Sequence, residues 1–334
     1  MSINQLISEN LFERVLLEPA KRGARELFVL SGYASASMVT KHIEVVSKEL
    51  SVDLSIDLHI GMSGRDGLSR NTLLGLQSIP RQIGDRSFNC TLSAQGESNH
   101  SKIYVWCDDS GPKEAYLGSS NYTQLGFGLS QASRSHKEIC VAVDPVSAFD
   151  CVMASAQGGI SYRSPDIANF IDLFDDQLTS KANDDEIPAV ETPSTFVELP
   201  LVMSRAADQG EVHHKSGLNW GQREGRDPDQ AYIPIPSTIA KSKFFPEKGV
   251  HFQVVTDDGE AFICTVAQDG DKALETPSDN SILGKYFRKK LGLPPGAFIE
   301  KAHLANFGSN MVRIYRETDD FYRLSFQPGR LFKL

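Results

Sequence analysis

Long apolar runs and paired cysteines are both missing from this 334-residue chain. No apolar run is long enough to span a bilayer, and no charged-then-apolar leader follows Met1. The five cysteines contain no Cys-x-x-Cys pair and mostly lie inside apolar runs, which predicts buried free thiols and argues against a zinc site. The sequence therefore predicts a cytoplasmic protein that has no membrane partner.

An excess of positive charge is also missing, since the formal net charge is -9. The charge is unevenly spread: residues 1–174 carry a net −4, residues 175–212 a net −7 and residues 213–334 a net +2. An acidic total therefore does not exclude a local basic face that binds nucleic acid. The length alone predicts two domains.

The first part of the chain alternates between strand and helix patterns. Strands are expected over Glu26–Leu30, Leu54–Ile60, Ser87–Leu92, Lys102–Val105 and Glu138–Val143. Helices are expected over Ile3–Arg22, Ser37–Leu50, Leu68–Ile79 and Pro165–Leu178. Pro80 is expected to stop the third helix. This alternation predicts an α/β domain over residues 1–178, a mixed sheet with helices on both faces.

The pattern changes twice after this domain. Residues 179–212 are acidic and contain several prolines, which predicts a linker, with Phe196-Val197 joining a neighbour as a short strand. Beyond it, short strands are expected over Ala231–Ile235, His251–Thr256, Ala261–Val266, Met311–Tyr315 and Tyr322–Phe326. A hairpin turn is expected at residues 257–260 and a basic amphipathic helix at Ser281–Leu291. Residues 213–334 therefore predict a mainly β, barrel-like domain.

One stretch concentrates groups that suit phosphoryl chemistry. His100 and Lys102 open an apolar run and would share one face of a strand. The next strand ends in Gly118-Ser119-Ser120-Asn121. Together they offer a nucleophile or base, a positive charge and hydrogen-bond donors, which a phosphoryl group requires. Taken singly, such a His is more often structural and such a Lys more often idle, so the interpretation depends on the combination.

These motifs resemble the half-motif of the phospholipase D superfamily. With Gly61-Met62 and the stretches Gly217–Arg223 and Gln230–Pro234, the whole chain resembles the NgoFVII-type restriction endonucleases, and NgoAVII-like enzymes are the relatives it resembles most. Taken alone, Gly61-Met62 is better explained as a strand-end turn. The resemblance implies a phospholipase D-like nuclease domain fused to a B-three-like DNA-binding pseudobarrel. It also implies site-specific cleavage of double-stranded DNA through a phosphohistidine intermediate, without a metal.

The resemblance assigns roles to the site residues. His100 would be the nucleophile or the acid, Lys102 would neutralise the phosphate oxygens, and Ser119 or Ser120 with Asn121 would donate hydrogen bonds to them.

One position departs from the superfamily pattern. The Asp that often stands five residues after the Lys is Cys107 here. By resemblance, Glu138 is the candidate carboxylate that orients the imidazole, although glutamates at strand ends are common.

The mechanism needs two histidines, and the chain holds one convincing motif. His213-His214-Lys215 matches His-x-Lys literally, but no apolar strand and no Gly-Ser-x-Asn follow it, so we interpret it as a solvated loop. One copy per chain predicts a homodimer with a single catalytic centre. The resemblance implies that no cofactor is needed, and no Walker A loop is present for this chain to use ATP itself. The resemblance implies that any ATP use belongs to a separate ATPase or helicase-like partner, beside a cognate DNA methyltransferase.

Candidate DNA-binding residues fall in the last third of the chain. Asn, Gln and Arg side chains read adenine and guanine edges, and Lys contacts phosphates. The candidates are Asn219, Trp220, Gln222, Arg223 and Arg226 in one stretch, Asn280, Lys285 and Arg288 in a second, and Lys241 with Lys243 between them. The alternative remains open that Trp220 is core, that Arg226 pairs with Asp227 or Asp229, and that the lysines form a solvated helix face.

Two other functions are weighed against a nuclease. The first is a sequence-specific DNA-binding protein whose phospholipase D-like domain only dimerises, and the intact His, Lys, Ser and Asn argue against it. The second is a lipid phosphodiesterase, which the missing leader and missing apolar surface helix disfavour. A further hypothesis is that the acids around Asp184–Glu186 occupy the cationic cleft when DNA is absent, but an ordinary solvated linker explains them at least as well.

Overall fold

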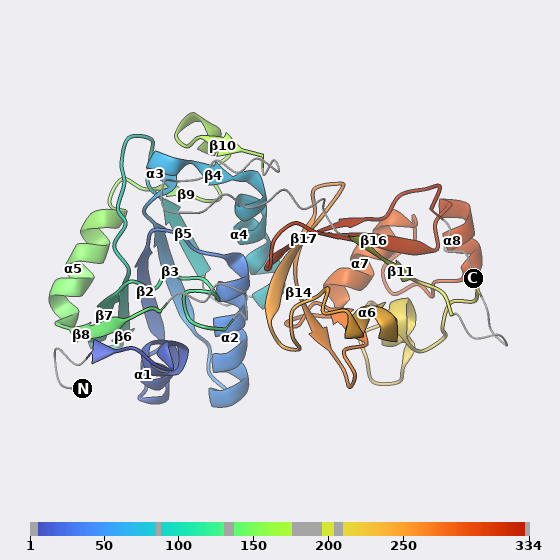
Figure 1. Cartoon of the computed structure of the whole chain (residues 1–334), viewed down its shortest axis with the longest axis horizontal. Coiled ribbons are helices and arrows are strands. Elements are labelled where there is room, and N and C mark those ends of the chain that lie inside the picture. Colours follow the sequence, from blue (N-terminus) through green and yellow to red (C-terminus); the bar gives the residue numbers. More distant parts are fainter. Residues whose placement is uncertain (1–5, 85–87, 130–136, 176–195, 204–209, 331–334) are drawn as a thin grey trace. The chain divides into compact units, whose positions relative to one another are not determined.

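The structure is a computed structural model that describes residues 6–84, 88–129, 137–175, 196–203 and 210–330. The chain divides into two compact units, Met1–Asp176 and Gln177–Leu334 (Figure 1). No helix of the described ranges is long and apolar enough to cross a membrane. All five cysteines are free thiols, four of them buried and Cys151 exposed.

The first unit is built on an eight-stranded mixed sheet. In spatial order its strands are β1 (Leu6–Ile7), β8 (Cys140–Val143), β7 (Gly111–Gly118), β6 (Ile103–Asp108), β2 (Glu26–Ser31), β3 (Ser55–Ile60), β5 (Phe88–Leu92) and β9 (Ile160–Ser161). β2, β3 and β5 are parallel to one another, and every other neighbouring pair is antiparallel. The expected mixed sheet is confirmed.

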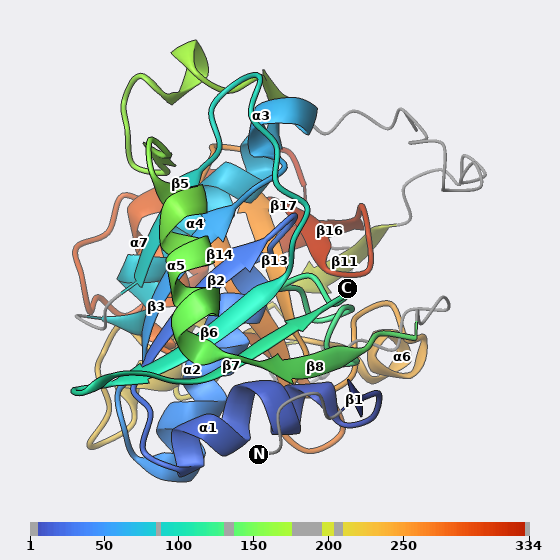
Figure 2. The ribbon, with the colours of Figure 1, turned by 90° about the vertical axis from the view of Figure 1, so that its left-hand side faces the viewer.

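Helices cover both faces of this sheet, as expected. α5 (Pro145–Ala156) lies on one face, and α2 (Ala36–Leu50) and α4 (Arg70–Ile83) lie on the other (Figures 1 and 2). The Ser35 side chain caps α2 and the Ser69 side chain caps α4, each by accepting a hydrogen bond from a backbone N–H of the first turn. Each of these two helices turns an apolar stripe to the core, which is why the sequence shows helical spacing there.

The first of three helix predictions that need correction concerns the N-terminus. In the described part of Ile3–Arg22, the expected helix is present as η1 (Phe12–Leu17) and α1 (Glu18–Lys21). Ahead of it, β1 forms the edge of the sheet by pairing with β8, so its backbone groups are satisfied in the sheet.

The other two corrections concern the end of α4 and the helix expected over Pro165–Leu178. α4 continues past Pro80 to Ile83, because buried Ile79 and Ile83 hold its last turn on the core. No long helix forms over the described part of Pro165–Leu178, which contains η2 (Ile167–Asn169) and β10 (Leu173–Phe174). Its backbone bonds to neighbouring segments instead, and β10 pairs with β4 (Leu68–Ser69).

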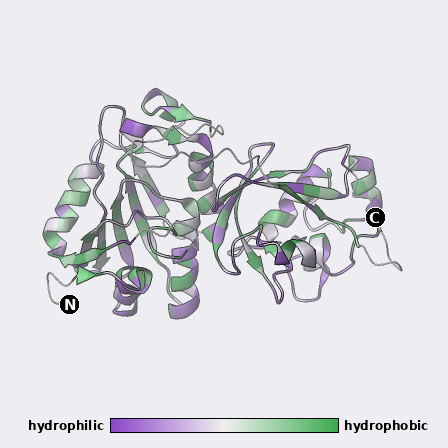
Figure 3. Cartoon of the chain, viewed as in Figure 1, coloured by the Kyte–Doolittle hydropathy of each residue, from purple (hydrophilic) through white to green (hydrophobic). Residues whose placement is uncertain are grey.

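The second unit is a nearly closed barrel, as expected. In spatial order its strands are β11 (Phe196–Pro200), β16 (Met311–Arg316), β17 (Phe321–Ser325), β13 (His251–Thr256), β14 (Ala261–Ala267), β15 (Ala273–Glu275) and β12 (Ile233–Pro234). The first and last strands of this order lie next to each other. β13 and β14 form the hairpin expected around residues 257–260. Apolar residues line the strands (Figure 3).

Helices complete the barrel and its core. They are η3 (Gly217–Gln222), α6 (Ser237–Lys241), α7 (Ser281–Lys290) and α8 (Lys301–Phe307). The expected basic helix is confirmed as α7, whereas α8 and β15 were not expected. Apolar side chains from the strands and from α7 form one continuous buried core.

The expected linker over residues 179–212 is partly wrong. β11, which lies within this stretch, pairs with β16, and this confirms the short strand expected at Phe196-Val197. Leu199, Leu201 and Val212 are buried in the barrel core. Apolar burial therefore assigns the described part of this stretch to the second unit, while Asp184–Glu186 lie outside the described residues.

Candidate functional site

The predicted catalytic residues meet at one edge of the first sheet. β2, β3 and β7 end at this edge, and β6 and β8 begin there, because they run antiparallel to their neighbours. His100 and Lys102 directly precede β6, Asn121 follows β7, and Glu138 precedes β8. The pair was expected on the strand, but β6 begins one residue later at Ile103. Topology, rather than the shared face of a strand, brings these groups together.

The exposed His100 imidazole packs against the backbone of Gly32. A Cβ atom on residue 32 would lie 2.6 Å from His100 Cδ2 and 3.3 Å from its Nε2, so an alanine would displace the ring. The same point is 3.3 Å from Asn121 Oδ1. That oxygen accepts a hydrogen bond from the Tyr33 N–H at 3.2 Å, which leaves the amide NH₂ to donate elsewhere. An imidazole and an amide donor therefore lie side by side.

Lys102 is buried beside this pair. Its Nζ donates to the backbone carbonyl of His100 at 2.7 Å, which uses one of its three N–H groups. Burial lowers the pKa of Lys102, and the negative charge of Glu138 opposes that effect. Partial burial, followed by the charge of Lys102, lowers the pKa of His100. The neutral imidazole, which has a free lone pair, is therefore favoured.

Glu138 contacts a different residue from the one expected. Its carboxylate accepts a hydrogen bond from the Ser119 hydroxyl, and the Ile139 N–H donates to the same hydroxyl at 3.1 Å. Glu138 therefore holds Ser119 and acts electrostatically on Lys102. The expectation that it orients the His100 imidazole is not met within one chain.

The two serines of the motif differ in exposure. Ser119 is exposed, whereas Ser120 is fully buried and its backbone carbonyl accepts a hydrogen bond from Tyr104 Oη at 2.6 Å. Of the two hydroxyls considered, only that of Ser119 is exposed at this edge, and its proton is donated to Glu138 in this structure.

Glycines after the strands carry a role that the sequence left open. A Cβ atom on Gly61 would lie 2.1 Å from the Asn99 carbonyl oxygen, and the Asn99 N–H donates to the Gly61 carbonyl at 2.8 Å. Gly61 is therefore more than a turn residue, because its missing side chain lets the segment that leads into His100 pack onto the end of β3. In the sequence, Gly32 and Gly61 each directly follow an apolar strand. These two glycines could have indicated that other segments pack closely against the ends of those strands.

Sequence reasoning also missed two polar side chains. The Tyr33 ring meets the His100 ring edge-on, and the Tyr33 hydroxyl donates to Asp66. Asp66 belongs to the short helix α3 (Ser63–Asp66), which follows β3. Its negative charge raises the pKa of His100, against the larger opposing effects of burial and Lys102. Within the described ranges, no group of three or more His, Cys, Asp or Glu side chains is arranged to hold a metal ion.

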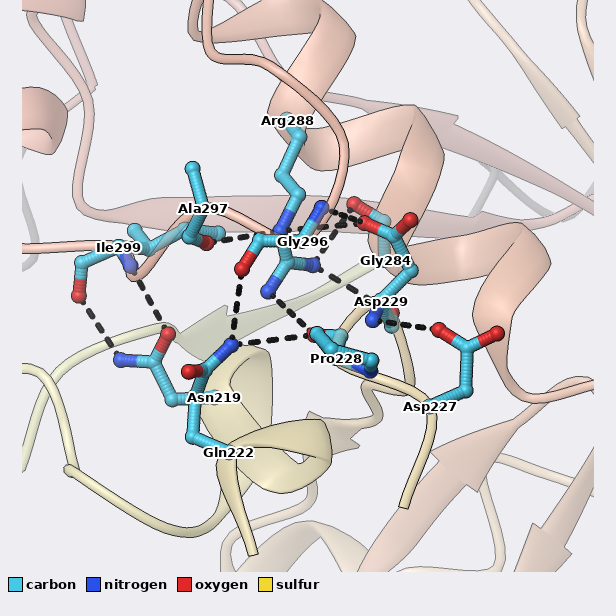
Figure 4. A network of polar contacts seen from close by, with 10 residues as sticks. All are labelled: Asn219, Gln222, Asp227, Pro228, Asp229, Gly284, Arg288, Gly296, Ala297 and Ile299. Atoms are coloured by element: carbon cyan, nitrogen blue, oxygen red, sulfur yellow. Dashed lines mark hydrogen bonds and ion pairs between the residues drawn. The ribbon is translucent and has the colours of Figure 1, made fainter.

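Two of the predicted DNA-binding residues are structural. Asn219 is fully buried: its amide donates to the Ile299 carbonyl at 2.8 Å, and its Oδ1 accepts from the Ile299 N–H at 2.9 Å (Figure 4). The amide also donates to the His213 carbonyl at 3.1 Å. Every polar atom of the side chain is used, so the prediction that Asn219 reads a base is wrong.

Arg288 is likewise buried, with 1% exposure. Its guanidinium donates to the carbonyls of Pro228, Asp229, Gly284 and Ala297, and it pairs with the Asp229 carboxylate at 3.3 Å (Figure 4). It therefore ties α7 to the turn before β12 and is unavailable to DNA, so this prediction is also wrong.

Gln222 and Asn280 are also engaged with the fold. The Gln222 amide donates to the carbonyls of Pro228 at 3.2 Å and Gly296 at 3.1 Å. Asn280 begins α7, and its backbone carbonyl accepts from the Ala231 N–H at 3.1 Å. Neither side chain is fully buried, so both remain candidates for DNA contact.

The exposed cations of the predicted segments remain available. Arg223 is exposed, and its Nε–H donates to the Lys215 carbonyl at 2.7 Å. Among the described residues, this is the one hydrogen bond that its guanidinium group makes. The Arg226 guanidinium stacks on the half-buried Trp220 ring at 4.0 Å and bonds to Gln230, so it does not pair with Asp227 or Asp229. Lys241, Lys243 and Lys285 are also exposed.

Sequence reasoning missed an aromatic and arginine row on the outer face of the barrel. Arg313 stacks on Phe196 at 4.3 Å, and Arg323 stacks on Tyr315 at 3.9 Å. Both guanidinium groups also pair with glutamates, at 2.6 and 3.2 Å. These contacts explain why polar residues alternate along β16 and β17, and they stabilise the sheet edge.

The first unit is an α/β fold that carries His-x-Lys and Gly-Ser-x-Asn at one end of its sheet, and the second is a barrel with exposed arginines. Together they define a phospholipase D-type nuclease joined to a DNA-binding module. Two family models match the chain: the NgoFVII restriction endonuclease N-terminal PLD domain over residues 9–158 and the NgoFVII C-terminal B3-like DNA-binding domain over residues 194–318. The chain therefore belongs to the NgoFVII-type restriction endonucleases, and the resemblance seen in the sequence is confirmed.

Other comparisons add little. A search of curated proteins found no match for this chain. Among solved structures, polyphosphate kinase from Porphyromonas gingivalis is similar, with 16% sequence identity and a TM-score of 0.29, over 50% of this chain and 26% of that one. The chain thus matches far less than two thirds of that enzyme, and this likeness supports no conclusion about function.

Proposed function

We propose that this protein is a cytoplasmic, site-specific endodeoxyribonuclease that hydrolyses DNA phosphodiesters through a phosphohistidine intermediate, without a metal ion, in a homodimeric active site. The observation that supports this most is the grouping of His100, Lys102, Ser119 and Asn121 at one sheet edge. These residues provide a neutral imidazole, an anchored ammonium group and neutral donors around one point, which suits an in-line displacement at phosphorus.

The chemistry proceeds in two steps that use one imidazole from each chain. The neutral His100 of one chain attacks phosphorus and forms a P–N bond while the P–O bond to a sugar oxygen breaks. The protonated His100 of the second chain gives its proton to that leaving oxygen. The second imidazole then takes a proton from water, whose oxygen attacks phosphorus and breaks the P–N bond. Lys102 and Asn121 stabilise charge on the non-bridging oxygens throughout.

A second copy of the chain is the proposed occupant of an apolar strip beside the site. Leu6, Leu117 and Ile139 are 61%, 40% and 44% exposed. Leu6 and Leu117 both pair with Val141 on β8, so they share its face of the sheet, and Ile139 lies two residues before Val141 on the same strand end. The strip runs directly into Ser119, so a partner that covers it approaches the half-site, which lacks a second imidazole.

The B3-like unit supplies the contacts to double-stranded DNA. Arg223, Arg226, Lys241 and Lys285 are the exposed cations that support this assignment, with the first two as base readers and the lysines as phosphate contacts. The family resemblance supports a separate ATPase or helicase-like partner and a cognate methyltransferase as companions of the enzyme.

Cleavage of DNA in excess EDTA tests the proposal. We expect the wild-type protein, assayed alone and with candidate partner proteins, to cut, and His100→Ala to lose cutting while it retains DNA binding. His213→Ala is the matched control, because it removes the histidine of the other His-x-Lys sequence. Stereochemistry at phosphorus sharpens the test: two displacements give net retention on a chiral phosphorothioate, whereas direct attack by water gives inversion. Inversion, or full activity of His100→Ala, would contradict the mechanism.

A further inference from the structure

Tyr33 is held firmly beside the candidate nucleophile. Its ring meets the His100 ring edge-on, with the centroids 5.9 Å apart and an angle of 76° between the planes. Its backbone N–H donates to Asn121 Oδ1 at 3.2 Å, and its carbonyl accepts from Ser31 Oγ at 2.6 Å. Its hydroxyl donates to the Asp66 carboxylate. Both the backbone and the side chain of Tyr33 are therefore fixed relative to the imidazole.

Gly32 forms a second wall of the same small site. The backbone of residue 32 is so close to His100 that an added Cβ atom would lie 2.6 Å from Cδ2. The imidazole is thus bounded by the peptide of Gly32 and by the edge of the Tyr33 ring. Two such contacts restrict the rotamers that His100 can adopt.

The charged groups that face His100 come from three elements. Lys102 ahead of β6 and Arg65 and Asp66 in α3 act on His100 directly, whereas Glu138 ahead of β8 acts on Lys102. Burial and the positive charge of Lys102 lower the pKa of His100, and Arg65 adds to this effect. Asp66 acts in the opposite direction. It is therefore the described charge that favours the imidazolium form of His100.

We propose that Tyr33 and Asp66 form a positioning pair for His100, in which the Tyr33 ring sets the orientation of the imidazole and Asp66 supplies the negative charge beside it. This inference rests on the proposed function, because it assumes that one imidazole of the dimer acts as an acid. That imidazole must carry a proton although it lies next to Lys102. The hydrogen bond from the Tyr33 hydroxyl fixes the carboxylate that makes this possible.

Asp66→Asn tests the electrostatic half of the proposal. Removal of the negative charge lowers the pKa of His100 further, so both limbs of the profile of kcat/KM against pH move to lower pH. The titration of His100, followed by NMR and assigned by the signal lost in His100→Ala, moves in the same direction. Asp109→Asn is the matched control, because it removes an exposed carboxylate from the turn between β6 and β7, at the opposite end of these strands. An unchanged titration in Asp66→Asn overturns the proposal.

Two substitutions at Tyr33 test the positioning half. Tyr33→Ala removes the ring, and we expect kcat to fall by roughly 10- to 100-fold while KM is nearly unchanged. Tyr33→Phe keeps the ring and restores most of kcat, but it loses the bond to Asp66. Equal kcat values for the alanine and phenylalanine variants, or wild-type kcat in Tyr33→Ala, would show that the ring does not position His100.

The failure of this inference differs from the failure of the proposed function. The NMR titration of His100 requires no cleavage, so it reports on Asp66 even in an inactive protein. If wild-type and His100→Ala proteins cut DNA equally, the proposed function fails and the titration still decides whether Asp66 acts on His100. If only the wild type cuts and Asp66→Asn titrates like it, this inference alone fails.

Discussion

The edge of the first sheet and the barrel stretch Gly217–Gln230 carry similar polar side chains, but the fold uses them differently. At the sheet edge His100 is exposed, and Lys102 uses one N–H on the protein backbone. In the barrel stretch Asn219 uses every polar atom internally, and its neighbour in space, Arg288, does the same. Residue type alone therefore does not distinguish a group that binds a ligand from one that completes the fold.

The physical reason lies in the backbone. Strands that end at the sheet edge satisfy their N–H and C=O groups in the ladder, so side chains just beyond them remain available for chemistry. The turn from Asp227 to Asp229 and the segment from Gly296 to Ile299 have no ladder, and their buried carbonyls need donors. Asn and Arg supply those donors, which is the same hydrogen-bonding capacity that made them appear to be base readers.

Among the substitutions that test this difference between the two regions, Arg288→Ala should have the largest effect on stability. The substitution removes the ion pair of the buried Asp229 carboxylate and the side-chain donor of four carbonyls, so we expect a loss of about 3–5 kcal/mol in the free energy of unfolding. Lys285→Ala on the same helix is the control, since Lys285 is exposed, and it should change stability by less than about 0.5 kcal/mol. Urea denaturation measures both. Equal effects of the two variants would show that Arg288 is not needed for the fold, and it would again be a candidate for DNA contact.

Gly32→Ala tests the other region, the sheet edge, through its effect on catalysis by His100. The added methyl group would lie 2.6 Å from His100 Cδ2, so the ring must move away from its position. We expect kcat to fall by roughly 100-fold, while DNA binding, which we assign to the other unit, is retained. Single-turnover cleavage and a gel-shift assay on the same preparation check this. Full activity would mean that the imidazole does not act from beside Gly32.

The sheet of the first unit was largely predictable because its strands are continuous apolar runs. Its edges were less so: β1 is two residues long, and pairing with β8 decides its structure. α5 was missed although Asp144 caps it and Pro145 starts it, signals that lie within the sequence. The helix expected at Pro165–Leu178 failed because its backbone bonds to segments distant in the chain, which local periodicity does not report.

The site was predictable where residues lie close in sequence. His100, Lys102 and Asn121 belong to one stretch of the chain, so spacing revealed them. Tyr33 and Asp66 lie beyond the ends of β2 and β3, and only the parallel register of these strands places them beside His100. The motif thus gave the reacting groups, whereas the groups that orient them required the fold.

Asn219→Ala should destabilise the barrel less than the loss of Arg288. It removes three hydrogen bonds and leaves the N–H and C=O of Ile299 buried and unpaired, which costs about 2 kcal/mol. Thermal and urea unfolding measure the change. If DNA binding falls while stability is unchanged, Asn219 contacts DNA after all, and the comparison between the two regions loses its main support.

Arg226→Ala should have the smallest effect and the most specific one. Arg226 lies exposed on the face of Trp220 and bonds to Gln230, so its loss costs the fold little, about 0.5–1 kcal/mol. As a base reader it should contribute about 1–3 kcal/mol to DNA binding, so its loss should weaken the affinity by roughly 5- to 150-fold. Lys248→Ala is the control, an exposed barrel cation paired with Asp269. If Arg226→Ala relaxes sequence preference, the stretch reads bases; if it weakens all sequences equally and lowers the salt dependence, Arg226 contacts phosphate instead.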